Sequence, residues 1–473
     1  MSESVSVALF TADLRLYDNP VLAEAATADR TVPFFVVDPG IARAGFAAPN
    51  RAAFLAECLA DLDEGLRSRG GRLVVRYGDT VEQVCRVVRE TGASEVHIAG
   101  GVSGYATGRE ERLRTELVGL RCGLVAHDAV ITAVPPGVIT PADRDHFAVF
   151  TPYWRRWQAE PLRPLRAAPR RVAVPEAVDG HPLPTASDLT GPGDGELSPG
   201  RPRGGERAGR ALSGGWRRDG LDAYGERHDD LAGDATSHLS PYLHFGCLSA
   251  TELVRRARGS GEHPGSWPEK APGKGSGTED FVRQLAWRDF HHQVLAARPD
   301  AAWHDYRKRN DRWRTAPEEV AAWKEGRTGY PVVDAAMRQL RHEGWMHNRA
   351  RLLAASFLAK TLYIDWRIGA RHFLDLLVDG DLVNNQLNWQ WVAGTGTDTR
   401  PNRVLNPVRQ GIRFDPEGKY VRRWVPELGG LAGRSVHEPW KLHERDRARY
   451  DYPEPIVSLA EGQERFAEGR NPR

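Results

Sequence analysis

The sequence has few cysteines, and their positions exclude two kinds of scaffold. Cys58, Cys85, Cys122 and Cys247 are too few for a chain of 473 residues to depend on a disulfide framework. None of them stands beside another Cys or His at the spacing of metal ligands. We therefore expect four buried, reduced thiols and no metal site.

The sequence also lacks an excess of either charge and any long apolar run. Its 65 basic residues balance 63 acidic ones, for a net charge of +2, so a basic surface for nucleic acid can only be local. No apolar run reaches membrane-spanning length, and no basic segment followed by an apolar stretch opens the chain. We expect a cytoplasmic protein without membrane contact.

What the sequence does contain, over residues 1–131, is an alternation of short apolar runs and helical patterns. Strands are predicted at 5–10, 32–37, 72–76 and 95–99 and around Leu124, with helices between them. This alternation predicts an α/β domain with a doubly wound parallel sheet. The first strand is followed by residues 11–15, TADLR, and not by G-x-G-x-x-G, so a standard dinucleotide site is not expected here.

A connector and a second, all-α domain are predicted after this domain, in keeping with a length that favours two cores. We assign residues 132–215 to the connector, because 161–215 are rich in Pro, Gly and Arg and are expected to be partly ordered at best. Residues 216–473 form the helical domain, with a surface loop predicted at 259–277. Apolar spacing of three and four predicts its helices at 251–258, 280–297, 317–325, 332–343, 348–362 and 366–378.

Two polar segments, 344–351 and 379–385, bracket one predicted helical hairpin. Together they supply two acids, two arginines and several amides. Exposed ion pairs are one interpretation, but such pairs stabilise little. The tryptophans and apolar helices on either side predict burial instead, and buried charges need partners. A planar heterocycle with hydrogen-bonding edges would satisfy Asp, Asn and Arg side chains together.

Three further segments carry weaker signals. The hydroxyl-rich run 236–246 predicts either a helix cap or a pyrophosphate site. Trp389-Gln390-Trp391 predicts one indole facing the core and one facing a cleft, since helical neighbours point in different directions. The arginine-rich loop 400–411 is typical either of a solvated face or of phosphate contacts.

Long strings in these segments resemble the photolyase/cryptochrome family, and specifically class I cyclobutane pyrimidine dimer photolyases. They are GWMHNRARLLAASFLAKTLYIDWRIGARHF and LLVDGDLVNNQLNWQWVAGTGTDTRPNRVLNP, with TSHLSPYLHFG, QLAWRDFHH and FTADLRLYDNP in the family's order. The resemblance covers nearly the whole chain. It implies an N-terminal antenna domain and a helical domain that holds FAD in a U shape.

The resemblance assigns roles residue by residue. The FAD contacts it implies are Tyr224, Thr236, Ser237, His238, Leu239, Ser240, Gln284, Asn348, Arg349, Arg351, Asp379, Asp381 and Asn385. Within this set, Arg349 is expected to pair with Asp379, and Asn385 to lie beside flavin N5. The DNA contacts it implies are His228, Trp287, Arg288, Leu352, Trp391, Arg403 and Gln410, with Trp287 and Trp391 as walls around a flipped dimer.

The catalytic roles follow from the same resemblance. Trp389, Trp366 and Trp313 match an electron-transfer chain from flavin to surface, and Gln284 and Asn385 match residues beside the reacting groups. The implied reaction is electron transfer from light-excited reduced FAD to a cyclobutane dimer in UV-damaged DNA, by a monomer without a protein partner. A cryptochrome-like photoreceptor and, less favoured, a (6-4) photolyase are the alternatives.

The antenna and two substitutions distinguish this chain within the family. Phe35, Asp38, Arg51 and Arg109 resemble members that bind 8-hydroxy-5-deazaflavin (8-HDF), with a folate (MTHF) as the alternative antenna. Gln284 replaces a Glu that often bonds the dimer, and Leu352 replaces a Met. Gln keeps hydrogen-bonding groups without the charge, and Leu roughly conserves volume. We interpret both as tuning of the activity.

Overall fold

The computed structural model describes residues 3–190, 195–259 and 276–470. The chain forms two compact units. Unit 1 is Met1–Leu197, Pro202–Asp222 and Ser237–Pro299, and unit 2 is Ser198–Arg201, Ala223–Thr236 and Asp300–Arg473. This division differs from the sequence-based one, since residues 237–259 and 276–299 belong to the same unit as the α/β part of the chain.

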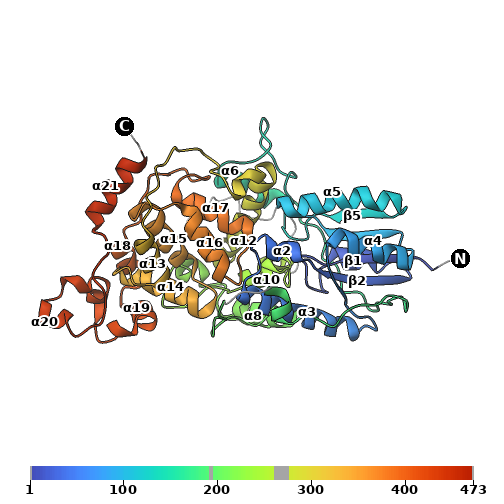
Figure 1. Ribbon diagram of the computed structural model, residues 1–473, viewed down its shortest axis with the longest axis horizontal. Coiled ribbons are helices and arrows are strands. Elements are labelled where there is room, and N and C mark those ends of the chain that lie inside the picture. The colour runs from blue at the N-terminus through green and yellow to red at the C-terminus, as the bar shows by residue number, and fades with distance from the viewer. Residues whose placement is uncertain (1–2, 191–194, 260–275, 471–473) are drawn as a thin grey trace. The chain divides into compact units, whose positions relative to one another are not determined.

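The centre of unit 1 is a five-stranded parallel sheet in the order β3-β2-β1-β4-β5. The strands are β1 Val5–Leu9, β2 Arg30–Val37, β3 Val74–Tyr77, β4 Glu95–Ala99 and β5 Gly123–His127. Runs such as VSVAL and PFFVV are buried on both faces, as a sheet covered by helices on both sides requires. Figure 1 shows α3 and α5 on opposite sides of the strands. The predicted doubly wound sheet is confirmed.

The helices of unit 1 include those that cross between the strands. They are α1 Pro20–Ala25, α2 Pro39–Arg43, α3 Pro49–Arg67, α4 Thr80–Thr91, α5 Gly104–Gly119, α6 Phe150–Ala159, α7 Ala186–Thr190, α8 Glu206–Asp219, α10 Ser240–His244, α11 Ala250–Arg258 and α12 Gly277–Ala297. The four cysteines are free and buried, as predicted.

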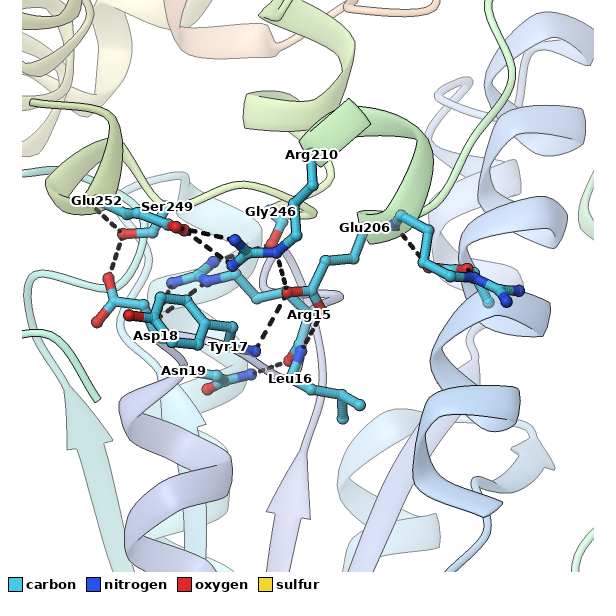
Figure 2. Close-up of polar contacts among 12 residues, drawn as sticks. Arg15, Leu16, Tyr17, Asp18, Asn19, Glu206, Arg210, Gly246, Ser249 and Glu252 are labelled. Atoms are coloured by element: carbon cyan, nitrogen blue, oxygen red, sulfur yellow. Dashed lines mark hydrogen bonds and ion pairs between the residues drawn. The ribbon is translucent and has the colours of Figure 1, made fainter. Parts of the chain in front are cut away.

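A buried ionic group joins the loop after β1 to α8 and α11; we call Arg15, Asp18, Glu206, Arg210 and Glu252 the β1 loop cluster (Figure 2). The Arg15 guanidinium donates to three carbonyls, including that of Gly246 at 2.9 Å. Glu206 accepts from the two backbone N–H groups that precede Asp18, and Arg210 forms two 2.9 Å bonds to Glu252. These bonds tie Gly246 to the loop after β1 and Glu252 to α8.

The backbone itself comes close at the same place. Gly246 has φ of 68°, and a Cβ there would lie 2.0 Å from the Ala12 carbonyl oxygen. Only glycine allows this approach.

The predicted connector is more ordered than expected. The prediction of little regular structure up to residue 215 was wrong at its end, where α8 begins at Glu206 and is fixed by the β1 loop cluster. Upstream, the His181 amide donates to the Val75 carbonyl at the sheet edge. The sequence missed this order because it comes from tertiary ion pairs, which have no local periodicity. Most of the predicted loop 259–277 lies outside the described residues.

Unit 2 is helical around one apolar core. Its helices are α9 Tyr224–Arg227, α13 Pro317–Glu325, α14 Pro331–Glu343, α15 Asn348–Ser356, α16 Trp366–Leu376, α17 Leu382–Ala393, α18 Pro407–Phe414, α19 Lys419–Trp424, α20 Glu444–Arg447 and α21 Leu459–Arg470. Shorter turns are η1 Pro299–Ala302 at the boundary between the units, the π-helix η2 Phe357–Thr361, η3 Pro426–Leu428, η4 Gly433–His437 and η5 Pro439–Lys441. In the described part of the chain, no helix is both long and apolar enough to cross a membrane.

Candidate flavin and DNA site

Helices α15, α16 and α17 bring the two polar segments of the sequence together within unit 2. The Val378 amide, after α16, donates to the Gly344 carbonyl, before α15, at 2.8 Å. A Cβ on Gly369 of α16 would lie 2.2 Å from the Trp389 ring of α17, so glycine permits the close packing of these helices. Asp381 caps α17 by accepting from the Val383 amide. Residues 379–385 therefore lie at the start of α15.

One arginine of α15 pairs with Asp379, and it is not the one expected. Arg351 donates to Asp379 Oδ2 at 2.8 Å, while Arg349 forms bidentate bonds of 2.7 and 2.8 Å to Asp229. The predicted Arg349–Asp379 pair is wrong. Residues two positions apart point to nearly opposite sides of a helix, so only one of these arginines can face Asp379.

Burial within this group is uneven, and the expectation of a wholly buried cluster was wrong. Asp379 is 8% exposed, whereas Asn348 is exposed and Arg351 and Asn385 are half-buried. The Asn385 amide nitrogen donates to the Ala370 carbonyl and to Gln386 Oε1, both at 3.0 Å. We call Asn348, Arg351, Asp379 and Asn385 the Asp379 cluster.

Two buried polar atoms of unit 2 mark capacity for a ligand. Asp379 Oδ1 and Thr236 Oγ1 are both buried without a hydrogen-bond partner among the residues the structure describes. Unpaired buried oxygens are costly. Asp379 Oδ1 can accept from the N–H edge of a heterocycle, while half-buried Arg351 and exposed Asn348 supply donors. The residues present therefore fit a flavin.

The remaining predicted FAD contacts come from other elements. Tyr224 is buried at the start of α9 in unit 2, and Asp381 is half-buried. Ser237, His238, Leu239, Ser240 and Gln284 belong to unit 1. His238 has φ of 51° and Gln284 is exposed on α12. Their contacts with FAD remain predictions.

The three tryptophans of the predicted electron-transfer chain lie in unit 2 in different surroundings. Trp389 is 2% exposed and packs edge-on against Phe373, with ring centroids 4.9 Å apart. Trp366 is fully buried and its indole N–H donates to Asp305 at 2.9 Å. Trp313 is half-buried against Tyr363, with centroids 4.9 Å apart. Trp313 is thus the most exposed of the three.

Trp391 and Arg403, two residues of the predicted DNA face, lie close together in unit 2. Trp391 is half-buried while Trp389 is buried, which confirms that the two indoles face different surroundings. The Arg403 guanidinium lies 5.2 Å from the centroid of the Trp391 ring. Leu352 packs on the edge of the core, and Gln410 is half-buried on α18.

His228 stands apart from this pair in the chain. Its Nδ1 lies 2.8 Å from the Tyr224 carbonyl oxygen, which orients the ring at the end of α9.

Trp287 and Arg288 lie on α12 in unit 1. The Trp287 ring stacks on Phe150 at a centroid distance of 3.8 Å and an angle of 8°, which fixes its orientation. Arg288 donates to the carbonyls of Ile131 and Leu243. Its guanidinium therefore already has partners in unit 1, and DNA contact by Arg288 stays a prediction.

Two of the predicted antenna residues, Asp38 and Arg109, lie near the carboxyl edge of the parallel sheet, where ligands of α/β domains usually bind. Asp38, directly after β2, accepts from Gly40, Thr80 and Tyr105, and these bonds lower its pKa although burial opposes them. Arg109 has a buried Nε with no partner in the described chain, and burial lowers its pKa.

Phe35 and Arg51 are the other two predicted antenna residues, and both are buried. Phe35 lies on β2, and Arg51 on α3 donates to the Phe46 carbonyl at 2.8 Å.

Two residues at the site were missed from sequence. Asp229 binds Arg349, but an acid beside His228 carries no recognisable ligand pattern. Trp323 is fully buried edge-on to Trp389, with centroids 6.1 Å apart, and its apolar helical spacing indicated only core packing.

Comparison with known proteins agrees with this fold. Residues 6–171 match the family model for DNA photolyase, and residues 281–471 match that for the FAD binding domain of DNA photolyase. The chain is 62% identical over 469 residues to a deoxyribodipyrimidine photo-lyase of Streptomyces griseus, covering 99% of each chain. The chain belongs to the DNA photolyase family.

Solved structures agree with this assignment. A bacterial class III photolyase from Agrobacterium tumefaciens superimposes with a TM-score of 0.90 at 30% identity, covering 99% of this chain and 97% of that one. An archaeal photolyase from Sulfolobus tokodaii with two FAD molecules gives 0.83 at 29% identity, covering 98% and 99%.

Proposed function

We propose that this protein is a light-driven repair enzyme for cyclobutane pyrimidine dimers in DNA. The observation that carries the proposal is the end-to-end 62% identity to a relative named deoxyribodipyrimidine photo-lyase. The unsatisfied Asp379 Oδ1 in the segment matched by the FAD-binding model supports it independently. When bound, reduced FAD supplies the light-excited electron that splits the dimer.

The chain's own residues orient the reactants and set the charge around them. Arg351, held by Asp379, would place a cation beside a bound flavin and favour its negatively charged form. Asn385, whose amide donates to the Ala370 carbonyl, is proposed to lie beside the flavin ring. Trp389, Trp366 and Trp313 are proposed to carry electrons inward. Trp287 and Trp391 are proposed as the walls around the flipped dimer, and Arg403 is proposed to bind DNA phosphates.

The deciding experiment is repair of an oligonucleotide with one cyclobutane dimer under blue light, with a dark sample as the control. The purified protein should restore the two pyrimidines only in the light. Its binding to the lesion should weaken steeply as salt rises. A flavin-loaded protein that restores nothing would favour the photoreceptor alternative.

The lesion type is tested in the same assay with a (6-4) photoproduct. Gln284 is the one observation that favours this alternative, since the family's dimer enzymes often have Glu there. We expect repair of the cyclobutane dimer alone, and Gln284→Glu should change the rate only a few-fold, because Gln keeps the hydrogen-bonding groups. Repair of the (6-4) lesion would reverse the assignment.

We further propose a class I enzyme with an 8-HDF antenna at the carboxyl edge of the sheet. The position of Asp38 and Arg109 there, and the unpaired Arg109 Nε, support an anionic or carbonyl-rich ligand. The absorption spectrum distinguishes 8-HDF from a folate. A flavin-only spectrum that corresponds to two FAD per chain would instead match the Sulfolobus relative.

The predicted monomeric state and cytoplasmic location remain part of this proposal. Size-exclusion chromatography with light scattering tests the first, and fractionation of cells tests the second.

A further inference from the structure

The loop 400–406, between α17 and α18, carries Arg403 but has no regular structure of its own. Its backbone carbonyls therefore need partners from elsewhere. Arg403 is exposed, and its guanidinium lies 5.2 Å from the Trp391 ring centroid. The shape of this loop thus determines where a basic side chain and an aromatic ring of the proposed DNA face lie relative to each other.

A buried lysine lies beneath the loop. Lys360 is 1% exposed, and its ammonium donates to the carbonyls of Pro401 at 2.7 Å and Arg403 at 2.8 Å. Lysines are almost never fully buried unless they are paired. Here the hydrogen-bond partners are two backbone carbonyls of one loop. These two bonds help to offset the cost of burying the ammonium, and they tie the side chain to the loop.

The charges around Lys360 agree with this arrangement. Burial and the nearby Arg470 lower the pKa of Lys360 to about 7, while Asp398 and Asp311 oppose the shift and Arg403 adds to it. No carboxylate is hydrogen-bonded to this ammonium in the described chain, where its two bonds go to the loop carbonyls.

Two further contacts hold the loop at its two ends. Ser356, four residues before Lys360, accepts from the Leu405 amide at 3.2 Å. At the other end, a Cβ on Gly394 would lie 2.3 Å from the Pro401 carbonyl oxygen, so the loop rests directly on the end of α17. Between Ser356 and Lys360 the helix changes to the π-helix Phe357–Thr361, a form often found at functional sites.

Helix α15 and the π-helix η2 that follows it therefore carry residues of both proposed ligand sites of unit 2, the flavin site and the DNA face. Asn348 and Arg351 at the start of α15 belong to the Asp379 cluster, and Ser356 at its end and Lys360 in η2 hold the loop. We propose that Lys360 is a positioning residue for DNA binding, whose bonds to Pro401 and Arg403 fix the loop that presents Arg403 beside Trp391. The part of this inference that concerns DNA rests on the proposed function.

The test replaces Lys360 with Met, which keeps the apolar stem and removes the donors. Trypsin is the first probe, because the Arg403–Val404 bond lies in the loop while Arg400 is protected by the following proline. In the FAD-loaded protein without DNA, Lys360→Met should be cut at Arg403 about tenfold faster, since cleavage follows local opening. Its affinity for dimer-containing DNA should fall about fivefold at unchanged FAD content.

Two variants calibrate this result. Lys419→Met removes a positive charge from an exposed pair with Glu417 and should leave both readouts at their wild-type values. Ser356→Ala removes one weaker bond and should speed cleavage about twofold. If Lys360→Met does not fold, Lys360→Gln decides, because its shorter amide should reach one carbonyl and give faster cleavage.

The outcomes separate this proposal from the function on which it rests. A wild-type cleavage rate in the folded Lys360 variants would show that Lys360 does not fix the loop. Faster cleavage with unchanged DNA affinity would show that fixing the loop plays no part in DNA binding. Cleavage needs neither DNA nor light. A wild-type protein that does not bind dimer-containing DNA therefore refutes the proposed function, while the cleavage rate still tests whether Lys360 fixes the loop.

Discussion

The β1 loop cluster in unit 1 and the Asp379 cluster in unit 2 use the same chemical groups in opposite ways. In the first, Asp18 is fully buried and accepts from Arg163, from the Ser249 hydroxyl and from the Arg166 amide (Figure 2 shows the Ser249 bond). In the second, Asp379 has one ion pair with Arg351, and its other oxygen has no partner in the described chain.

The difference separates a polar group that holds the fold from one that awaits a ligand. A buried carboxylate whose oxygens are all satisfied has exchanged water for protein partners. Removing it leaves those partners buried without a hydrogen-bond acceptor or countercharge. A buried oxygen without a partner is a cost that a bound ligand can remove. Charge and burial alone do not distinguish these two clusters; they differ in whether every carboxylate oxygen has a partner among the described residues.

The largest expected effect is on the satisfied cluster. Asp18→Asn keeps the shape and tolerates the φ of 52°, but it leaves the half-buried Arg163 without its countercharge. We expect the free energy of unfolding to fall by about 3–5 kcal/mol. Urea denaturation of the FAD-free protein measures this loss. A change below about 1 kcal/mol would show that the cluster does not hold unit 1 together.

A third buried carboxylate, Asp289, has an oxygen without a partner in the part of the chain that the structure describes, but no proposed ligand. Asp289 in unit 1 is fully buried, and its Oδ2 accepts from Ala133, Val134 and Trp157. Its Oδ1 has no partner among the described residues, yet no ligand is proposed there. Burial raises the pKa of Asp289 from 3.8 to about 6, so a proton occupies this position in mildly acid solution.

The sign of the pH effect follows from this shift. The folded state binds the proton more tightly than the unfolded state, so the stabilisation is complete below pH 4 and is lost as pH rises through 6. Two units correspond to about 3 kcal/mol. The difference in unfolding free energy between wild type and Asp289→Asn should change by about this amount from pH 4 to pH 7. A flat difference would mean that Asp289 Oδ1 has another partner.

The sequence predicted the fold well where local patterns decide it. Strands such as Glu95–Ala99 and helices such as Pro317–Glu325 fall where apolar spacing placed them. Helix α8 was missed because it is held by ion pairs to a distant part of the chain: Arg210 pairs with Glu252, 42 residues further on. The contact of residues 245–252 with the loop after β1 was missed for the same reason.

The site was predicted as a set of residues, and its pairing was not. The motif around α15 drew attention to Arg349, Arg351 and Asp379 together. Which arginine faces Asp379 depends on helical phase and on the return of the chain after α16, and neither is readable from residue types. Asp229 could not be found because its role exists only once α9 lies beside α15.

The smallest effect expected on stability is at Asp379, where the change should appear in cofactor binding instead. Asp379→Asn removes the unpaired acceptor's charge, while Arg351 still bonds the Met346 carbonyl and remains half-exposed. We expect FAD affinity to fall about tenfold, or about 1.4 kcal/mol. The unfolding free energy of the FAD-free protein should change by less than about 1 kcal/mol, because the ion pair that is lost is partly exposed.

The matched control for Asp379→Asn is Asp375→Asn, on the preceding turn, whose pair with Arg371 is exposed and which should keep its FAD. Fluorescence titration of stripped protein with FAD, beside urea denaturation, measures both quantities. If Asp379→Asn instead destabilised the FAD-free protein as strongly as Asp18→Asn does, the unpaired oxygen would be a structural feature like Asp18. The number of satisfied atoms would then no longer separate fold from function in this chain.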